Sequence, residues 1–389
     1  MKAVFINHSD RLGGASVVTR RLVEALRAHS DIDASMLVTG VEDPAPYIVR
    51  GAPRWRSRLP FLAEHLRIFA GNGHRRDTLF KISLASDGLP LHRHPAVKEA
   101  DVVVLNWVNQ GMLSFGEIGK IAAEKPVVWT MHDMWNLTAV CHHAGECSGY
   151  LADCSDCPML PAGSALARRT YDRKKSLYDA SGIRFVAVSR WLAGCAARSS
   201  LLRGRDISVI PNICPTVAPS GLKVPEGRLV TICAARLDDP VKGLDTAIEA
   251  VNHLPEVTFV TIGEIKNPGA MDGIRVPHIH LGTLDDADRQ AVFARSAAVI
   301  STSRYESFGA TLVEAQAAGA PPVAFTHDGR ADIIEDGVTG YVMKGDPADA
   351  IRRALERPLP AADLQAAAAR FSPRTVATSY AALLRTLRV

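Results

Sequence analysis

Short apolar segments alternate with helical segments along most of the chain, and this alternation constrains the fold more than any other feature. We predict strands at residues 2–7, 102–106, 127–131, 185–188, 229–234, 257–262, 298–301 and 323–326. Short apolar strands that are separated by helices are typical of parallel sheets buried on both faces. The sequence therefore predicts an α/β protein built from Rossmann-like, doubly wound sheets.

A proline-rich segment divides this pattern in two. Pro211, Pro215, Pro219 and Pro225 lie in a polar stretch, after which the alternation starts again. Such a stretch is typical of a linker, and 389 residues suit two domains of about 100–200 residues each. We predict Rossmann-like domains at residues 1–213 and 226–372, followed by a helix at residues 373–389 that begins with Ser372 and Pro373.

The composition is that of an ordinary soluble globular protein, with 47% hydrophobic and 22% charged residues. A net charge of +4 is too small for this length to indicate a nucleic-acid partner. No apolar run approaches the ~18 residues of a membrane span. Residues 1–7 lead directly into a strand pattern without the apolar core of a signal peptide, so the sequence predicts a cytoplasmic protein.

The segment from Ser303 to Ala315 contains two glutamates, Glu306 and Glu314, spaced eight residues apart. It follows an apolar strand, at the sheet edge where open α/β sheets bind ligands. We expect a helix to begin there, with the N–H groups of residues 307–309 free to bind an anion or a hydroxyl-rich ligand. Carboxylates accept hydrogen bonds from sugar and ribose hydroxyls. A nucleotide sugar is the simplest ligand that combines phosphate with many hydroxyls.

Two basic residues, Arg236 and Lys242, follow the first predicted strand of the second domain. Arginine binds phosphate oxygens in a bidentate manner and lysine acts as a point charge, so the pair suits a diphosphate. A solvated loop in which Asp238 and Asp239 neutralise the cations is the alternative. The two glutamates in the same domain favour the diphosphate interpretation.

The first domain carries two further candidate motifs. Gly13 and Gly14 lie between a strand and a helix, where glycines allow a ligand close to the backbone. The segment lacks the dinucleotide fingerprint and the Walker lysine, so a tight turn without a ligand fits equally well. His132 and Asp133 end another strand at the same sheet edge, and a helix cap by Asp133 is the alternative to a functional pair.

Four of the seven cysteines, Cys141, Cys147, Cys154 and Cys157, crowd into one loop at residues 141–158. Four thiolates can close a tetrahedral structural zinc site, and the final pair has the CxxC spacing. The first two spacings are unusual, and free thiols packed in an ordered loop are the alternative. An odd number of cysteines in a cytosolic chain argues against a disulfide framework.

Residues 54–76 mix arginines with tryptophan, phenylalanine and leucine. This composition suits contact with an anionic membrane surface, although a solvated helix with one buried stripe has a similar pattern. A lipid-linked substrate would favour the membrane interpretation.

Taken together, these motifs resemble the retaining glycosyltransferases of family 4, which have the GT-B fold. The resemblance runs along essentially the whole chain and rests on motifs in family order. These are the glycine turn at 13–14, Arg236, Lys242, the Glu306-to-Glu314 spacing with Phe308 and Gly309, and the segment 336–340. Residues 128–135 and the cysteine loop after them are similar to a bacterial subgroup of colanic-acid-type exopolysaccharide transferases.

The resemblance implies two Rossmann-like domains that face a cleft, with the acceptor on the first and the donor on the second. Glu314 would bind the ribose, Glu306 the donor sugar, and backbone amides near Ser307, Phe308 and Gly309 would assist. Arg236 and Lys242 would neutralise the departing diphosphate, so catalysis would need no metal or other cofactor. His132 would lie beside the donor sugar, Gly13 and Gly14 near the phosphates or acceptor, and the final helix would cross back to the first domain.

The implied reaction transfers a sugar, with retention, from a UDP- or GDP-type donor to a glycan or lipid-linked acceptor. A protein that does so for cell-surface polysaccharide would work at the inner face of the membrane. Departures at Asn106, at residues 212–214 and at residues 327–329 leave donor and acceptor identity open. A nucleotide-sugar epimerase or sugar-phosphate synthase is one alternative, since fold alone does not separate them. A non-catalytic scaffold of a glycan-assembly complex is the other.

Overall fold

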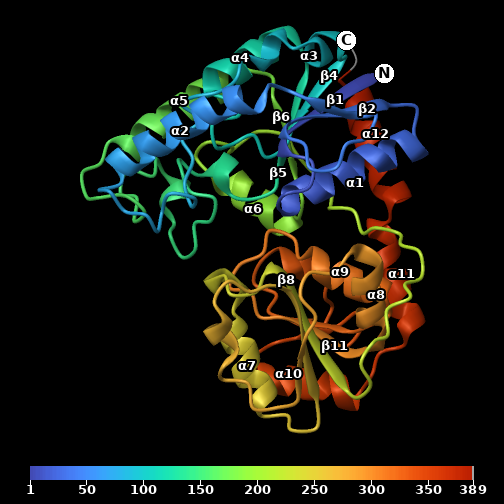
Figure 1. The fold of residues 1–389 in the computed structure, drawn as a ribbon. Coiled ribbons are helices and arrows are strands. Elements are labelled where there is room, and N and C mark those ends of the chain that lie inside the picture. Colours follow the sequence, from blue (N-terminus) through green and yellow to red (C-terminus); the bar gives the residue numbers. More distant parts are fainter. Residues whose placement is uncertain (388–389) are drawn as a thin grey trace. The chain divides into compact units, whose positions relative to one another are not determined.

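The structure is a computed structural model that describes residues 1–387. The chain divides into two compact α/β units (Figure 1). The first unit comprises Met1–Pro211 and the final segment from Val376 onward, and the second comprises Asn212–Thr375. Residues 211–226, between the two sheets, contain neither helix nor strand.

The first unit is built on a seven-stranded parallel sheet with the order β3-β2-β1-β4-β5-β6-β7. Its strands are β1 (Lys2–Ser9), β2 (Asp33–Gly40), β3 (Ile48–Arg50), β4 (Val102–Leu105), β5 (Val127–Met131), β6 (Arg184–Ala187) and β7 (Ile207–Val209). Its helices are α1 (Gly14–His29), α2 (Arg54–Gly71), α3 (Pro95–Glu99), α4 (Phe115–Glu124), α5 (Leu166–Ala180), α6 (Arg190–Arg198) and α12 (Pro373–Arg385), the last beginning at the end of the second unit.

The second unit is built on a six-stranded parallel sheet with the order β10-β9-β8-β11-β12-β13. Its strands are β8 (Leu229–Arg236), β9 (Thr258–Glu264), β10 (His278–His280), β11 (Ser296–Ser301), β12 (Pro322–Ala324) and β13 (Tyr341–Val342). Its helices are α7 (Leu244–Asn252), α8 (Asp286–Arg295), α9 (Ala310–Ala317), α10 (Pro347–Glu356) and α11 (Ala361–Ala368).

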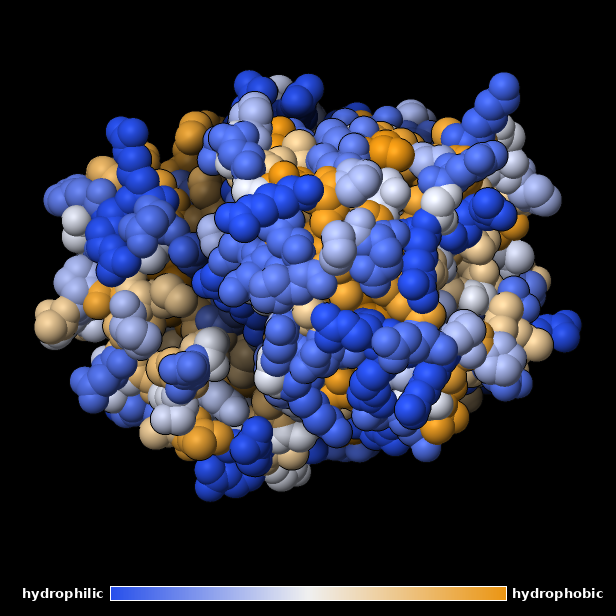
Figure 2. Space-filling view, turned by 90° about the horizontal axis from the view of Figure 1, so that it is seen from below, coloured by the Kyte–Doolittle hydropathy of each residue, from blue (hydrophilic) through white to orange (hydrophobic). Residues whose placement is uncertain are grey.

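Each unit has its own core, because every central strand is buried on both faces. In the first unit, Trp129 of β5 packs against Trp135, Tyr178 and Phe185. The last helix contributes to this core through Tyr380, whose hydroxyl lies 3.0 Å from that of Thr130. In the second unit, aliphatic residues of β8 and β11 pack against α7 and α10. On the face shown in Figure 2, hydrophilic residues predominate and hydrophobic ones form small patches among them.

The predicted fold class is confirmed: both units are parallel, Rossmann-like sheets covered by helices. All eight predicted strands occur, some with shifted ends. The prediction missed β2, β3, β7, β10 and β13. Four of these have only two or three residues, and β2 mixes small and polar residues with its apolar ones.

The strand order identifies the place in each sheet where a ligand is expected. The order reverses between β1 and β4 in the first sheet and between β8 and β11 in the second. Open α/β sheets bind ligands outside the carboxyl ends of the strands at such a switch point. Within residues 1–387, no helix has both the length and the apolar character that crossing a membrane requires.

Candidate functional site

The loops that follow β8 and β11 meet at the switch point of the second sheet. Lys242, at the end of the first loop, places its Nζ 2.7 Å from Oε1 of Glu306 in the second. The N–H of Arg304 donates to the carbonyl of Val241 at 2.8 Å and ties the loops together. Both side chains of the ion pair are partly exposed. A cation for phosphate and an acceptor for hydroxyls therefore lie side by side at the predicted ligand position.

A buried ion pair between Asp328 and Arg330 supports the loop that contains Glu306. Asp328 accepts two hydrogen bonds of 2.8 Å from the Arg330 guanidinium and one of 2.8 Å from the N–H of Glu306. Asp328 is 1% exposed and Arg330 is 0% exposed. Gly329, between them, passes so close to the loop that a Cβ would lie 2.1 Å from the carbonyl oxygen of Ser307. Only glycine fits there without a backbone shift.

These cations also control the charge of Glu306. Burial alone would raise the pKa of the Glu306 carboxyl, but Lys242 and Arg330 outweigh this effect and hold the pKa below its usual value. Glu306 is therefore ionised at neutral pH. An ionised carboxylate only accepts hydrogen bonds, which suits recognition of sugar hydroxyls.

Helix α9 begins later than predicted. Gly309 has φ 98° and precedes the first helical residue, Ala310, so residues 307–309 form the turn before the helix. The prediction of helix N-terminal amides at residues 307–309 was wrong by three residues, because the left-handed glycine delays the helix. Phe308 is buried against Phe371, at 5.5 Å between ring centroids, and Ser307 Oγ lies 3.0 Å from the Tyr305 hydroxyl.

Glu314 lies one turn into α9 and forms an ion pair that the sequence did not reveal. Its Oε2 accepts a 2.9 Å hydrogen bond from Nε of Arg289 in α8, and Glu314 is 5% exposed. Arg289 also binds Asp286, one turn earlier in its own helix, at 2.7 Å. Burial would lower the pKa of Arg289, but the Glu314 carboxylate outweighs burial and raises it. Arg289 therefore fixes the orientation of Glu314.

Arg236 ends β8 at the same switch point, and its Nε lies 3.1 Å from Oδ1 of Asp238. Asp238 also accepts hydrogen bonds from the N–H groups of Lys266 and Asn267. Asp238 is thus a local partner of Arg236, as the alternative interpretation expected. Asp239 instead caps the short helix that ends at Lys242, and Lys242 pairs with Glu306. Arg236 remains 45% exposed and can still reach an anion.

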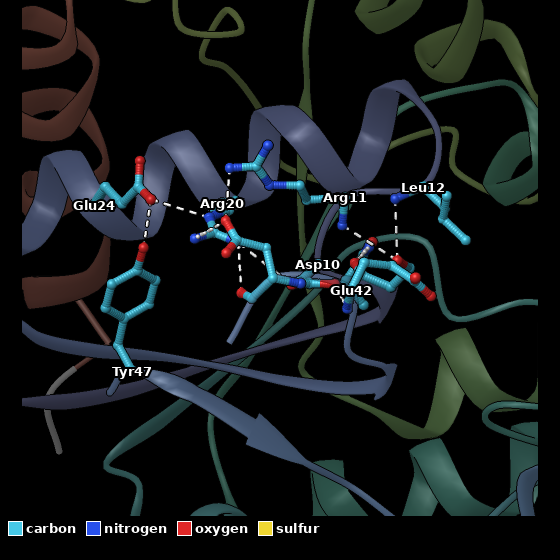
Figure 3. A network of polar contacts seen from close by, with 10 residues as sticks. Asp10, Arg11, Leu12, Arg20, Glu24, Glu42 and Tyr47 are labelled. Carbon is cyan, nitrogen blue, oxygen red and sulfur yellow. Dashed lines mark hydrogen bonds and ion pairs between the residues drawn. The ribbon is translucent and has the colours of Figure 1, made fainter. Parts of the chain in front are cut away.

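Polar contacts hold the segment just before the glycine turn of the first unit, around Asp10 to Leu12 (Figure 3). Asp10 accepts hydrogen bonds from the N–H groups of Glu42 and Asp43 and from Arg20. Ser9 Oγ accepts hydrogen bonds from the N–H groups of Arg11 and Leu12.

Gly13 in this turn has φ 90° and leads into α1. A Cβ added at Gly13 or Gly14 would meet no atom within 4 Å. The turn is therefore an open, fixed segment of backbone at the first switch point.

His132 directly follows β5. Its Nε2 lies 3.0 Å from Oδ1 of Asn106, the residue after β4. Burial lowers the pKa of His132 to about 4, against the opposing effect of Asp133. The imidazole is therefore neutral at neutral pH. One of its nitrogens donates a hydrogen bond and the other accepts one, and the ring supplies no positive charge.

Asp133 begins a chain of hydrogen bonds with the connectivity of a hydrolytic triad. Its Oδ2 lies 2.7 Å from Nδ1 of His142, whose Nε2 lies 2.9 Å from Oγ of Ser83. Ser83 is 1% exposed, so no substrate reaches its hydroxyl. Burial would raise the pKa of Asp133, but His142, His143 and the Trp135 N–H outweigh it and lower the pKa to about 2. The chain is structural, and it anchors the start of the cysteine loop.

The four loop cysteines line one cavity of about 20 Å³. The N–H groups of Ala139 and Gly149 lie 3.4 Å from the sulfurs of Cys154 and Cys147. The N–H of Ala139 favours the Cys154 thiolate, the form that binds metal, but burial outweighs it and raises the pKa of this thiol. Within residues 1–387, however, no three His, Cys, Asp or Glu side chains are already arranged to hold an ion. Structural zinc therefore stays a prediction that requires the thiols to turn inward.

Metal analysis of the purified protein checks this prediction. We expect about one zinc per chain, because a structural site uses four protein ligands. Replacing Cys154 and Cys157 by serine removes two ligands and should abolish the bound zinc, whereas Cys233→Ser, in a strand of the second unit, should keep it. If the native protein contains no zinc and a chelator does not lower its stability to unfolding, the four thiols are packed in the loop without a metal.

The comparisons with known proteins bear directly on the second unit. Residues 218–371, which contain Arg236, Lys242, Glu306 and Glu314, match the family model described as Glycosyl transferases group 1. These residues are thus similar to a group 1 glycosyltransferase domain. The matched segment includes the Lys242–Glu306 pair, the supporting pair Asp328–Arg330, and the Arg289–Glu314 pair.

Curated proteins that are similar to parts of this chain include several glycosyltransferases. A glycogen synthase of Pseudomonas fluorescens is 34% identical over 147 residues, which cover 35% of this chain and 29% of the relative. A D-inositol 3-phosphate glycosyltransferase of Streptomyces griseus is 27% identical over 275 residues, which cover 62% and 57%. The chain spans less than two thirds of the length of these relatives.

Solved structures of low sequence identity share the fold of the whole chain. A sucrose-phosphate synthase from Thermosynechococcus elongatus has a TM-score of 0.66 at 17% identity and covers 99% of this chain and 98% of its own. HepE of Anabaena, solved with UDP and glucose, has a TM-score of 0.61 at 18% identity over both full chains. At such identity the likeness establishes the fold alone, which is that of the GT-B glycosyltransferases.

Proposed function

We infer that the protein is a retaining glycosyltransferase that moves a sugar from a nucleoside-diphosphate sugar to a hydroxyl of a growing glycan. The observation that carries this inference is the Lys242–Glu306 pair, 2.7 Å apart at the switch point of a unit similar to a group 1 glycosyltransferase domain. It supplies a cation for the diphosphate and a carboxylate for the sugar in adjacent positions.

The proposed chemistry follows from these two charges. As the bond from the sugar to the diphosphate breaks, negative charge grows on the leaving oxygens, and Lys242 stabilises it. Preorganised charges of this kind are usually the largest contribution to catalysis. Arg236 adds a second cation, and the acceptor proton passes to the leaving phosphate on the same face. Since both cations belong to the chain, no metal ion is needed at this step.

Two observations support a nucleoside-diphosphate sugar as donor: the position of Glu314 and the ligands of structural neighbours. Glu314, fixed by Arg289, accepts hydrogen bonds from ribose hydroxyls, while Glu306 and the turn at Ser307–Gly309 bind the sugar. Structural neighbours have been solved with UDP and with UDP-glucose, which supports a nucleoside-diphosphate donor of the UDP or GDP type. By the family resemblance alone, we assign His132 to the donor sugar and the Gly13–Gly14 turn to the phosphates or the acceptor.

The acceptor belongs to the same proposal. Resemblance of residues 128–158 to exopolysaccharide transferases supports a lipid-linked, cell-surface glycan as acceptor. A phosphatidyl-myo-inositol mannosyltransferase of Mycobacterium leprae, 32% identical over 165 residues, is a relative whose name specifies a lipid substrate. Such an acceptor requires the protein to work in the cytoplasm, at the inner face of the membrane.

Donor binding tests the assignment of Glu314. Glu314→Ala should weaken binding of UDP or GDP, whichever the native protein binds, by roughly ten- to hundred-fold, since a hydrogen bond to a charged group contributes roughly 1.5–3 kcal/mol. Titration calorimetry measures it. Asp286→Ala is the matched control, because it removes the other carboxylate bound to Arg289 but no ribose contact. Equal affinities for Glu314→Ala and Asp286→Ala would contradict the role of Glu314.

A further inference from the structure

One face of α2 carries four large apolar side chains that the first unit leaves uncovered (α2 is labelled in Figure 1). They are Trp55, Leu59, Leu62 and Leu66, each between 54% and 67% exposed. Their spacing of four, three and four residues places them in one stripe along the helix. Single exposed leucines are common, but a continuous stripe of this kind indicates a binding surface.

The opposite face of the helix is buried and contains its one acidic residue. Glu64 accepts hydrogen bonds from the N–H groups of Leu84, Ala85 and Gly111, at 2.6–3.1 Å. Ile68, one turn later, is also buried. Because Glu64 is turned inward, the exposed surface of α2 carries no negative charge of its own.

Arginines flank the apolar stripe on both sides. With about 100° between successive residues, Arg54 and Arg58 fall on one side and Arg56 and Arg67 on the other. Arg67 pairs with Asp87, and the Arg56 guanidinium lies 5.1 Å from the Trp55 ring. For Arg54, Arg56 and Arg58, the structure of residues 1–387 shows no ion pair with a carboxylate.

A groove of about 320 Å³ lies beside this helix, and three arginines and one carboxylate, that of Glu42, line it. It is lined by Arg50 at the end of β3, by Arg54 and Arg58 of α2, and by His8 near the end of β1. The arginines beside the apolar stripe thus also face a space large enough for a phosphate headgroup.

We propose that α2 lies on an anionic lipid surface, with its apolar stripe among the acyl chains and Arg54, Arg56 and Arg58 on lipid phosphates. An apolar face bordered by cations is the pattern of an interfacial helix, and each basic residue near an anionic membrane adds to binding. A second copy of the same face would instead bring like charges together. The proposal rests on the membrane contact that is part of the proposed function. Vesicle binding is measured without any sugar transfer, so it can fail or succeed independently of the enzymatic test.

Vesicle sedimentation of the full chain tests the proposal. We expect binding to vesicles of phosphatidylglycerol and phosphatidylcholine at least about ten-fold tighter than to phosphatidylcholine alone, and weaker binding at high salt, because the basic residues contribute electrostatically. The double variant Leu59→Glu and Leu66→Glu should lose at least about ten-fold in affinity for the mixed vesicles. Arg54→Ser with Arg58→Ser should lose the preference for anionic lipid.

Val338→Glu is the matched control, since Val338 is a 52% exposed apolar residue of the second unit. It should bind vesicles as the native protein does. The proposal is overturned if the native protein does not bind anionic vesicles, or if the leucine variant, folded by circular dichroism, binds as well as the control. Loss of a native dimer in the leucine variant, without vesicle binding by the native protein, would assign the stripe to a second copy of the chain.

Discussion

Lys242→Ala is expected to lower turnover of the nucleotide sugar by about 10²–10³-fold, the usual effect of removing one preorganised group that stabilises charge in the transition state. Lys242 lies at the switch point and contacts Glu306 directly. The charge that it neutralises develops only as the donor bond breaks. The loss should therefore appear mainly in kcat, with a smaller change in KM.

The matched control for this prediction is Lys344→Ala. Lys344 lies just after β13 in the same unit, is 75% exposed and pairs only loosely with Asp336, at 3.8 Å. This variant should keep native turnover. Release of nucleoside diphosphate, followed with and without acceptor, measures both. If Lys242→Ala turns over donor as fast as Lys344→Ala, the Lys242–Glu306 pair is structural.

Arg330→Met is expected to destabilise the second unit by about 3–5 kcal/mol, because it leaves the buried Asp328 carboxylate without its partner. Adding Asp328→Asn should recover part of this loss, since the pair is then removed rather than broken. Recovery should be incomplete, as Asp328 also accepts the N–H of Glu306.

The distribution of tryptophan allows the two units to be followed separately. All five tryptophans, at positions 55, 107, 129, 135 and 191, belong to the first unit. In urea, far-UV circular dichroism should report earlier unfolding of the second unit in Arg330→Met, while the tryptophan fluorescence transition stays at the native midpoint. Native midpoints by both probes would show that the pair does not brace the Glu306 loop.

The fold, both members of the Lys242–Glu306 pair and one member of the Arg289–Glu314 pair could be predicted from sequence, for a physical reason. Short runs rich in valine, isoleucine and leucine between helical segments are typical of buried strands. Lys242, Glu306 and Glu314 follow such runs at recognisable spacing. Strands as short as β13, with two residues, leave no such pattern.

Arg289 and the Asp328–Arg330 pair could not be predicted, because tertiary packing sets their contacts. Arg289 lies in a helix of mixed charged and apolar residues, and only the contact between α8 and α9 brings it to Glu314. No pattern in the sequence marks Asp328 and Arg330 as a buried pair, whereas the structure buries both charges beside the Glu306 loop. Gly309 could be seen in the sequence, but its positive φ of 98° could not. That φ makes α9 begin at Ala310, three residues later than predicted.

Product analysis of a single nucleotide sugar with a lipid-linked glycan acceptor tests the central claim most directly. The proposed function predicts that nucleoside diphosphate is released in step with sugar transfer, that release depends on acceptor, and that nuclear magnetic resonance shows the new linkage with the anomeric configuration of the donor. An altered donor sugar formed without acceptor would instead indicate an epimerase. Tight donor binding without any product would indicate a scaffold, and either result would contradict glycosyl transfer.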